Sequence, residues 1–219
     1  MASGEIKLET VVSSLFAENA YILNIHGRND CVVVDPGLEP EKIIAHLDHY
    51  QLVPAAILLT HGHSDHIAGC AMLKQRWPDC PLVIGVNEVA KLTDPQANLS
   101  ASFGFDLTAP PADVAVVHGQ RYSAAGLDFE VREIPGHSAG HVVFLLADNA
   151  PPWVLVGDVI FAGSIGRTDF PDGDFEKLTQ GIHRELFTLS DKTVLLPGHG
   201  PPTTVGREKQ TNPFVGVQE

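Results

Sequence analysis

The stretch Thr60-His61-Gly62-His63-Ser64-Asp65-His66 directly follows the apolar run Ala55-Ala56-Ile57-Leu58-Leu59. An apolar run that ends in three imidazoles and a carboxylate is typical of a buried strand whose polar end enters a cleft. Side chains alternate along an extended chain, so we expect His61 and His63 to point the same way. The two ligand types that follow, Asp65 and His66, can then turn toward a second point nearby. Imidazole and carboxylate bind zinc, iron and manganese, so this stretch predicts a site for more than one metal ion.

Three later segments repeat the pattern of an apolar strand that ends at glycine and a candidate ligand. Their last residues are Pro135-Gly136-His137, Val156-Gly157-Asp158 and Pro197-Gly198-His199. Glycine lets the backbone turn tightly and approach a bound ion closely. A single Gly-His pair is common in surface turns. Three such endings beside the first cluster predict that their final residues complete a metal site.

With these motifs in place, the chain resembles the metallo-β-lactamase fold superfamily. The match runs from Val32-Val33-Val34-Asp35-Pro36-Gly37 to Pro197-Gly198-His199-Gly200 and includes the H-x-H-x-D-H motif. The resemblance implies an α/β fold, an αβ/βα four-layer sandwich of two mixed β-sheets flanked by helices. It also implies two divalent metal ions as cofactors, with zinc as the first expectation and iron or manganese as alternatives. By motif position, seven residues would hold them: His61, His63 and His137 the first ion, Asp65, His66 and His199 the second, and Asp158 both.

Such a pair of ions can bridge a water and lower its pKa enough to hold hydroxide at neutral pH, which then attacks an electrophilic carbonyl. Asp65 is the expected catalytic side chain, because it can orient the hydroxide and later pass a proton to the product. No G-x-S-x-G elbow or catalytic-cysteine signature occurs in the sequence. The site therefore predicts hydrolysis of an ester-like bond without a protein nucleophile.

The expected substrate rests on a narrower resemblance. Residues 163–171 and 197–214 look like the corresponding stretches of short glyoxalase-II-like hydrolases, which cleave hydroxyacyl-glutathione thioesters such as S-lactoylglutathione. The sequence stops soon after Asn212-Pro213-Phe214, without the C-terminal helical region that carries much of the glutathione-binding surface in full-length glyoxalase II. The resemblance therefore predicts a small-molecule thioester substrate and leaves glutathione recognition open.

Other readings use the same scaffold. Persulfide dioxygenases also resemble this chain and hold one iron through the positions of His61, His137 and Asp158. Lactonases share the whole ligand set. True β-lactamases are disfavoured, because they have cysteine or no bridging carboxylate at the position of Asp158. A non-catalytic metal-binding protein is a further alternative, although degenerate members usually lose ligands and none is missing here.

Composition and charge limit the remaining classes. The 219 residues include 44% hydrophobic and 19% charged residues, without a linker, which predicts one domain over residues 1–219. The net charge of −13 and the lack of a basic run argue against a nucleic-acid partner. Residues 1–5 show no signal peptide, and no apolar run approaches the ~20 residues that span a bilayer. The lack of such a run predicts no membrane partner. The cysteines, Cys31, Cys70 and Cys80, form no C-x-x-C pair, which fits a reducing cytoplasm.

The hydrophobic patterns predict the element order. We expect strands at residues 6–12, 21–25, 31–34, 55–59, 82–84, 113–117, 127–133, 141–146, 153–156 and 193–196, and helices at 40–50, 67–77, 88–92 and 175–187. Residues 94–112 are irregular and are interpreted as a loop over the site or an insertion. His141 is expected to begin a strand rather than bind metal. Asp35 is a candidate to steady a ligand imidazole.

Overall fold

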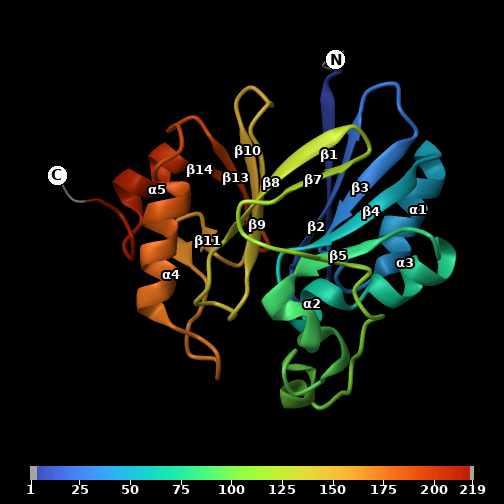
Figure 1. The fold of residues 1–219 in the computed structure, drawn as a ribbon, viewed down its shortest axis with the longest axis horizontal. Helices are drawn as coiled ribbons and strands as arrows, with labels where there is room; N and C mark the ends of the chain where they lie inside the picture. Colours follow the sequence, from blue (N-terminus) through green and yellow to red (C-terminus); the bar gives the residue numbers. More distant parts are fainter. Residues whose placement is uncertain (1–3, 218–219) are drawn as a thin grey trace.

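The computed structural model describes residues 4–217 and contains two six-stranded β-sheets that lie face to face (Figure 1). The first sheet has the order of the sequence: β1 (Ile6–Val12), β2 (Asn19–Ile25), β3 (Asp30–Val34), β4 (Val53–Leu59), β5 (Leu82–Gly85) and β6 (Val114–Val116). Its first three strands are antiparallel, whereas β3 to β6 run parallel. The sheet is therefore mixed.

The second sheet has the order β14-β13-β10-β9-β8-β7. Its strands are β7 (Arg121–Ala124), β8 (Leu127–Glu133), β9 (Val142–Leu146), β10 (Trp153–Gly157), β13 (Val194–Pro197) and β14 (Thr203–Thr204). Only β10 and β13 pair in parallel, so this sheet is mixed as well. A separate short hairpin joins β11 (Ile160–Phe161) to β12 (Ser164–Ile165).

Helices cover the outer face of each sheet (Figure 1). The first sheet is covered by α1 (Pro40–Tyr50) and α3 (Cys70–Arg76), and α2 (Ser64–Ile67) directly precedes α3. The second sheet is covered by α4 (Phe175–Gly181), its continuation η3 (Ile182–Leu186) and α5 (Val205–Thr211). Two 3-10 helices, η1 (Val86–Thr93) and η2 (Ser100–Phe103), lie after β5. This is the four-layer arrangement that the resemblance implies.

Alternation along the strands explains the layers. In β4, Ala56 and Leu58 face the core between the two sheets, whereas Ile57 and Leu59 face the core under α1 and α3. The strand β9 divides its residues in the same way between the central core and the core under α4. Both strands are buried on their two faces and therefore read as continuous apolar runs. In β4 this is the pattern expected of a parallel strand between two layers.

The predicted helix at residues 67–77 differs from the observed one. The helical turn α2 already begins at Ser64, and the helix is then interrupted at Gly69, directly before α3. The N–H of Gly69 donates to the carbonyl of Pro36 at 2.7 Å, and a side chain at position 69 would collide with that loop. This contact with the loop after β3 is tertiary, so helical spacing alone could not locate it. None of the helices within residues 4–217 is both long and apolar enough to cross a membrane.

The central core supplies a test of the packing. Phe129 is fully buried and its ring lies 6.1 Å from that of Phe144, whereas Phe175 is 50% exposed at the start of α4. We expect Phe129→Ala to lower the free energy of unfolding by roughly 3–5 kcal/mol, because it leaves a cavity between the sheets. The matched control Phe175→Ala should cost less than about 1 kcal/mol. Urea unfolding followed by circular dichroism measures both, and equal losses would contradict the assignment of the central core.

Candidate metal centre

The seven candidate ligands all lie where strands of the two sheets end. His61 and His63 follow β4, and Asp65 and His66 occupy the first turn of α2. The second sheet supplies the other three from the ends of β8, β10 and β13: His137, Asp158 and His199. The structure thus brings together side chains from both sheets, as the repeated strand endings predict.

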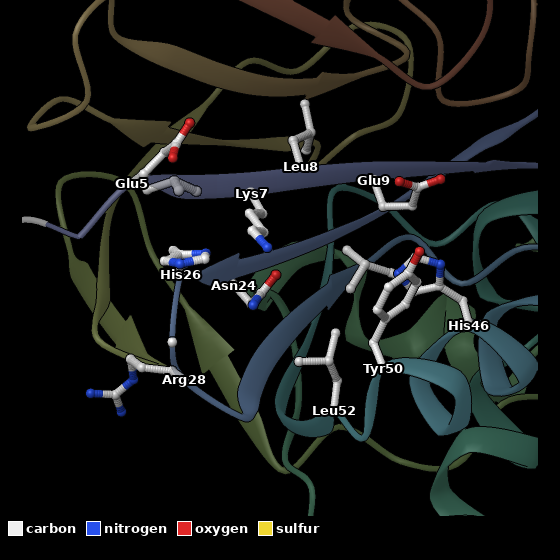
Figure 2. Close-up of a pocket in the computed structure, with 13 residues that line it drawn as sticks. Glu5, Lys7, Leu8, Glu9, Asn24, His26, Arg28, His46, Tyr50 and Leu52 are labelled. Atoms are coloured by element: carbon white, nitrogen blue, oxygen red, sulfur yellow. The ribbon is translucent and has the colours of Figure 1, made fainter.

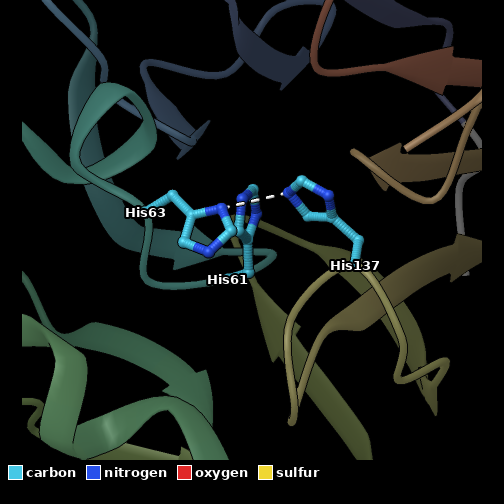
Figure 3. A group of neighbouring side chains, drawn as sticks. All are labelled: His61, His63 and His137. Atoms are coloured by element: carbon cyan, nitrogen blue, oxygen red, sulfur yellow. Dashed lines mark hydrogen bonds between the residues drawn. The ribbon is translucent and has the colours of Figure 1, made fainter. Parts of the chain in front are cut away.

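Their donor atoms form three overlapping groups, and the group of His61, His66 and Asp158 joins the other two. Figure 3 shows His61, His63 and His137 turned toward one another, with Nδ1 of His63 3.0 Å from Nε2 of His137. A second group consists of Asp65, His66 and His199, in which Nε2 of His199 lies 3.3 Å from the Asp65 carboxylate.

Asp158 lies between the two groups. Its Oδ1 is 3.4 Å from Nε2 of His66, and its Oδ2 is 3.5 Å from Nε2 of both His137 and His199. The two carboxylate oxygens thus face imidazoles of both groups. This is the position that a bridging ligand requires.

Hydrogen bonds to Nδ1 orient four of the imidazoles. His137 Nδ1 lies 2.9 Å from the carbonyl of Arg167, and His199 Nδ1 lies 3.1 Å from that of Phe16. Since a carbonyl only accepts, each Nδ1 must carry the hydrogen, which leaves the lone pair of Nε2 directed at the centre. His61 Nδ1 is held in the same way by the hydroxyl of Thr60 at 3.1 Å.

Asp35 organises the fourth imidazole. Its carboxylate accepts hydrogen bonds from the backbone N–H and the hydroxyl of Thr60, at 2.8 and 2.7 Å, and faces Nδ1 of His66 at 3.1 Å. Because the hydroxyl of Thr60 donates to Asp35, its oxygen is free to accept from His61. One carboxylate therefore fixes both His61 and His66, in agreement with the steadying role expected for Asp35.

The residues fit a metal centre because several of their inward donor atoms have no other partner. Among the described residues, no hydrogen bond reaches three buried atoms of the ligand set: Nε2 of His61, Nε2 of His66 and Oδ1 of Asp158. A buried polar atom without a partner costs roughly 1–3 kcal/mol. Neutral imidazole nitrogens and carboxylates that converge in this way are the donor set of zinc, iron and manganese sites.

Burial and charge divide the imidazoles into two classes. Burial lowers the pKa of His61, His63 and His137, so these rings are neutral and ready to bind an ion at neutral pH. Burial acts in the same direction on His66 and His199. For these two, the carboxylates of Asp65 and Asp158 outweigh burial and raise the pKa.

The same attraction acts on the two carboxylates. Burial would raise the pKa of Asp158, but His66, His137 and His199 outweigh it and hold that pKa far below the ordinary value. His66 and His199 likewise lower the pKa of Asp65. Both carboxylates are thus charged at neutral pH, which is the protonation state that binds cations.

Two glycines allow the strand ends to approach the ligands. Gly157 has a φ of +47°, and a side chain there would collide with Thr60 and His141. A side chain on Gly198 would collide with the Asp158 carboxylate and the ring of His66. Both close approaches are of the kind that the strand-glycine-ligand pattern predicts.

A buried network that sequence reasoning missed ties two ligand loops together. The Glu88 carboxylate accepts from the backbone N–H groups of Gly62 at 2.8 Å and Gly140 at 2.7 Å, and from the hydroxyl of Ser138 at 2.6 Å. Lys91 contacts Glu88 and Ser138 and pairs with Asp172. The only sign of this network in the sequence is the spacing of Glu88 and Lys91 on one short helix. That spacing does not reveal partners about fifty residues away.

His141 and Glu18 are two further buried groups beside the centre. His141 stacks on His61 at 4.7 Å, and its Nε2 accepts from the backbone N–H of Asp158 at 3.1 Å. It therefore supports ligands, and the strand begins one residue later than expected, at Val142. Glu18 lies against Gly37 with its carboxylate buried, and burial raises its pKa well above the ordinary value.

The centre opens into a cleft of about 470 Å³. A second hollow of about 450 Å³ lies beside β1, β2 and α1, where Lys7, Asn24, His26, His46 and Tyr50 line it (Figure 2). That hollow contains none of the seven candidate ligands. Of these two cavities, only the first is lined by candidate ligands: His63, Asp65, His137, Asp158 and His199.

Comparison with known proteins agrees with this geometry. The family model described as the metallo-beta-lactamase superfamily matches residues 14–199. A probable metallo-hydrolase, YqgX of Bacillus subtilis, is 39% identical over 90% of this chain and 92% of its own length. The hydroxyacylglutathione hydrolase GloC of Haemophilus influenzae is 33% identical over 96% of this chain and 98% of its own.

Two solved structures share the fold over nearly their whole length. The BLEG-1 B3 metallo-beta-lactamase has a TM-score of 0.90 and 34% identity, and the match covers 95% of this chain and 99% of that one. TTHA1623, solved in a di-iron-bound form, has a TM-score of 0.82 and 37% identity, with 94% and 99% coverage. These matches confirm the predicted fold of two mixed sheets flanked by helices.

The role of Asp35 can be tested with an isosteric change. Asp35→Asn retains a side chain that tolerates the left-handed backbone at this position (φ +46°). It turns an N–H₂ group toward Thr60 or His66, which both donate to the native carboxylate. We expect a loss of zinc affinity of about 10–100-fold, measured by competition with a chromogenic chelator. Asp191→Asn, on an exposed side chain paired with Lys209, is the control. Equal affinity in Asp35→Asn and the control would contradict the role.

The two classes of imidazole predict an unequal release of protons. Because neighbouring carboxylates raise the pKa of His66 and His199, these rings keep a proton to higher pH than ordinary imidazoles, and each must lose that proton to bind an ion. Binding two zinc ions at pH 7 should therefore release about one to two protons, and affinity at this part of the centre should rise with pH. Calorimetry in buffers of different ionisation enthalpy counts the protons. His199→Ala should lower the number of protons released by about one. A metal titration without proton release would refute the assignment of His66 and His199 as rings that lose a proton.

Proposed function

The chain belongs to the metallo-β-lactamase superfamily, and from this premise we propose that it is a two-metal hydrolase that cleaves thioesters. The proposal assigns His61, His63 and His137 to the first ion and Asp65, His66 and His199 to the second, with Asp158 shared. Its main support is the three buried donor atoms without a protein hydrogen bond, Nε2 of His61, Nε2 of His66 and Oδ1 of Asp158, which lie among overlapping groups of possible metal ligands. Zinc is the proposed metal. Iron is the alternative, which the di-iron form of TTHA1623 supports.

Two divalent ions bound there would activate a shared water and polarise the scissile carbonyl. The chain's own groups prepare that chemistry. Asp65 borders the cleft and is held by Nε2 of His199 at 3.3 Å, so its carboxylate is placed to orient the attacking water and to carry a proton to the departing thiolate. Asp158 fixes the spacing of the two groups of imidazoles. Nearby phenylalanines exclude bulk water from the reacting atoms.

The proposed substrate is a hydroxyacyl thioester, with S-lactoylglutathione as the first candidate. The 33% identity to a hydroxyacylglutathione hydrolase over nearly the whole of both chains supports this choice. A thiolate is a good leaving group, so the reaction needs no protein acid stronger than Asp65. The proposal places the reaction in a reducing cytoplasm. Three free cysteines support this, and burial raises the pKa of Cys31 to about 12 and that of Cys80 to about 11.

Persulfide oxidation on a single iron is the second candidate function. It would use His61, His137 and Asp158. The di-iron form of TTHA1623 supports iron as the metal, but not the single ion that this reaction would use. Oxygen uptake with glutathione persulfide separates this reaction from thiol release with S-lactoylglutathione. Lactone opening on the same ligands is distinguished with a homoserine-type lactone, whose hydrolysis forms a carboxylic acid and is followed by pH-stat titration.

Removal of single ligands tests the centre. We expect His63→Ala and Asp158→Ala to lower kcat/KM for S-lactoylglutathione by at least about 10³-fold and to lower metal content, because each loses a donor from a preorganised set. His183→Ala, on an exposed helical histidine, is the matched control and should keep both the kcat/KM and the metal content of the unchanged protein. Elemental analysis and a thiol-release assay measure the two effects. Full turnover in either ligand variant would remove that residue from the proposed site.

Chelation supplies the complementary measurement. Dialysis against a strong chelator should abolish thiol release, and added zinc should restore it. If thiol release persisted after elemental analysis had shown that the metal was gone, metal catalysis would be refuted. If oxygen uptake with the persulfide greatly exceeded thiol release, the second candidate would replace the first.

A further inference from the structure

The walls of the cleft beside the candidate ligands are largely apolar. Six apolar side chains line it, from three stretches of the chain: Phe16, then Leu99 and Phe103, then Phe161, Ile165 and Phe170. Two of them reach the candidate ligands. The ring of Phe170 lies 5.2 Å from that of His63 and 5.7 Å from that of His137, and the ring of Phe161 lies 6.1 Å from that of His199. The apolar surface therefore begins at the metal centre itself.

The outer part of the wall comes from residues 94–112, which the sequence predicts to be a loop over the site or an insertion. The rings of Phe103 and Phe16 pack edge to face at 5.6 Å, although Phe103 is 56% exposed. Leu99 beside them has a φ of +70°, which is unfavourable for a branched residue. Its neighbour Asn98 holds this turn through bonds to the carbonyls of Lys91 and Leu107. Backbone strain that is kept in place by such bonds is typical of a functional segment.

Charged groups in the cleft are few. Apart from the candidate ligands, Arg167 is the only charged residue among the described residues that line it. Its guanidinium is already engaged, because it forms two hydrogen bonds with Asp169, at 2.7 and 2.8 Å, and lies 4.3 Å from the ring of Phe170. Glutathione carries two carboxylates and an ammonium group at neutral pH. The cleft offers these three charges no set of matching partners.

We propose that this aromatic wall binds an aryl or other bulky apolar group beside the scissile carbonyl, and that the protein prefers aromatic acyl thioesters whatever thiol they carry. This inference rests on the proposed thioester hydrolysis and defines its substrate class. Burial of an apolar acyl group against the phenylalanines supplies binding energy next to the reacting bond. The thiol portion extends toward solvent and is not selected.

A panel of four thioesters tests the preference. It combines two acyl groups, lactoyl and its phenyl analogue mandeloyl, with two thiols, glutathione and the uncharged N-acetylcysteamine. With the zinc-loaded protein, we expect kcat/KM to be about tenfold higher for mandeloyl than for lactoyl with either thiol. Exchange of the thiol should change kcat/KM by less than about threefold. Equal rates for the two acyl groups, or a preference for glutathione of tenfold or more, would overturn the inference.

Variants locate the effect on the wall. Phe103→Ala should reduce the mandeloyl advantage, the ratio of the two kcat/KM values, to about twofold, because the phenyl group loses its contact with this ring. Phe105→Ala is the matched control, since Phe105 is 39% exposed in the same segment but does not line the cleft. Loss of the advantage in both variants would point to a general disturbance of residues 94–112 and would count against a direct contact.

Product binding separates this inference from the proposed function. If none of the four thioesters were cleaved, the proposed hydrolysis would fail, but the wall could still be measured. Calorimetric titration of the zinc-loaded protein with mandelate and with lactate compares the same hydroxy acid with and without the phenyl ring. We expect mandelate to bind about tenfold more tightly, and Phe103→Ala to remove most of that difference. Equal binding of the two acids would refute the aromatic preference by itself.

Discussion

The structure depends on one constraint: seven ligand-type side chains must be held with their donor atoms facing one another, and several of these atoms have no hydrogen-bond partner. Nε2 of His61 and His66 and Oδ1 of Asp158 are buried and unbonded among the described residues. Each such atom destabilises the folded chain unless a cation compensates it. The two sheets offset this destabilisation, because the donors lie at the ends of strands whose other residues are buried in three apolar layers. A rigid scaffold therefore carries a locally unfavourable centre.

The centre is held by bonds from outside it. Asp35 fixes His66 directly and His61 through Thr60, so one carboxylate orients imidazoles of both groups. Glu88 bonds to the backbone of the loop that carries His61 and His63 and to that of the loop that carries His137. Glu88 thus connects loops that belong to different sheets, whereas Asp35 connects the loops that follow β3 and β4 of the first sheet. The positions of the ligands are thus set by their supporting groups as much as by the strands.

The sequence predicted the strand ends well because two independent signals coincide there. Apolar runs set the strands, and glycine followed by histidine or aspartate marks the point where each one enters the cleft. His137, Asp158 and His199 could be placed in one site on that basis. Partners formed only by tertiary packing gave no comparable signal. Lys91 reads as an ordinary surface lysine on a short helix, yet it is 7% exposed and contacts Ser138 and Asp172.

Residues 94–112 show the same limit and its consequence for specificity. The stretch has no regular periodicity, and the conformation of Leu99 is set by bonds from Asn98 that no local pattern reveals. The stretch nevertheless places Leu99 and Phe103 over the metal centre. An apolar wall so close to charged ligands excludes water and strengthens every electrostatic interaction inside the cleft. The same surface cannot solvate a charged acyl group. The apolar wall that would increase the reactivity of the centre would therefore also restrict which substrates can reach it.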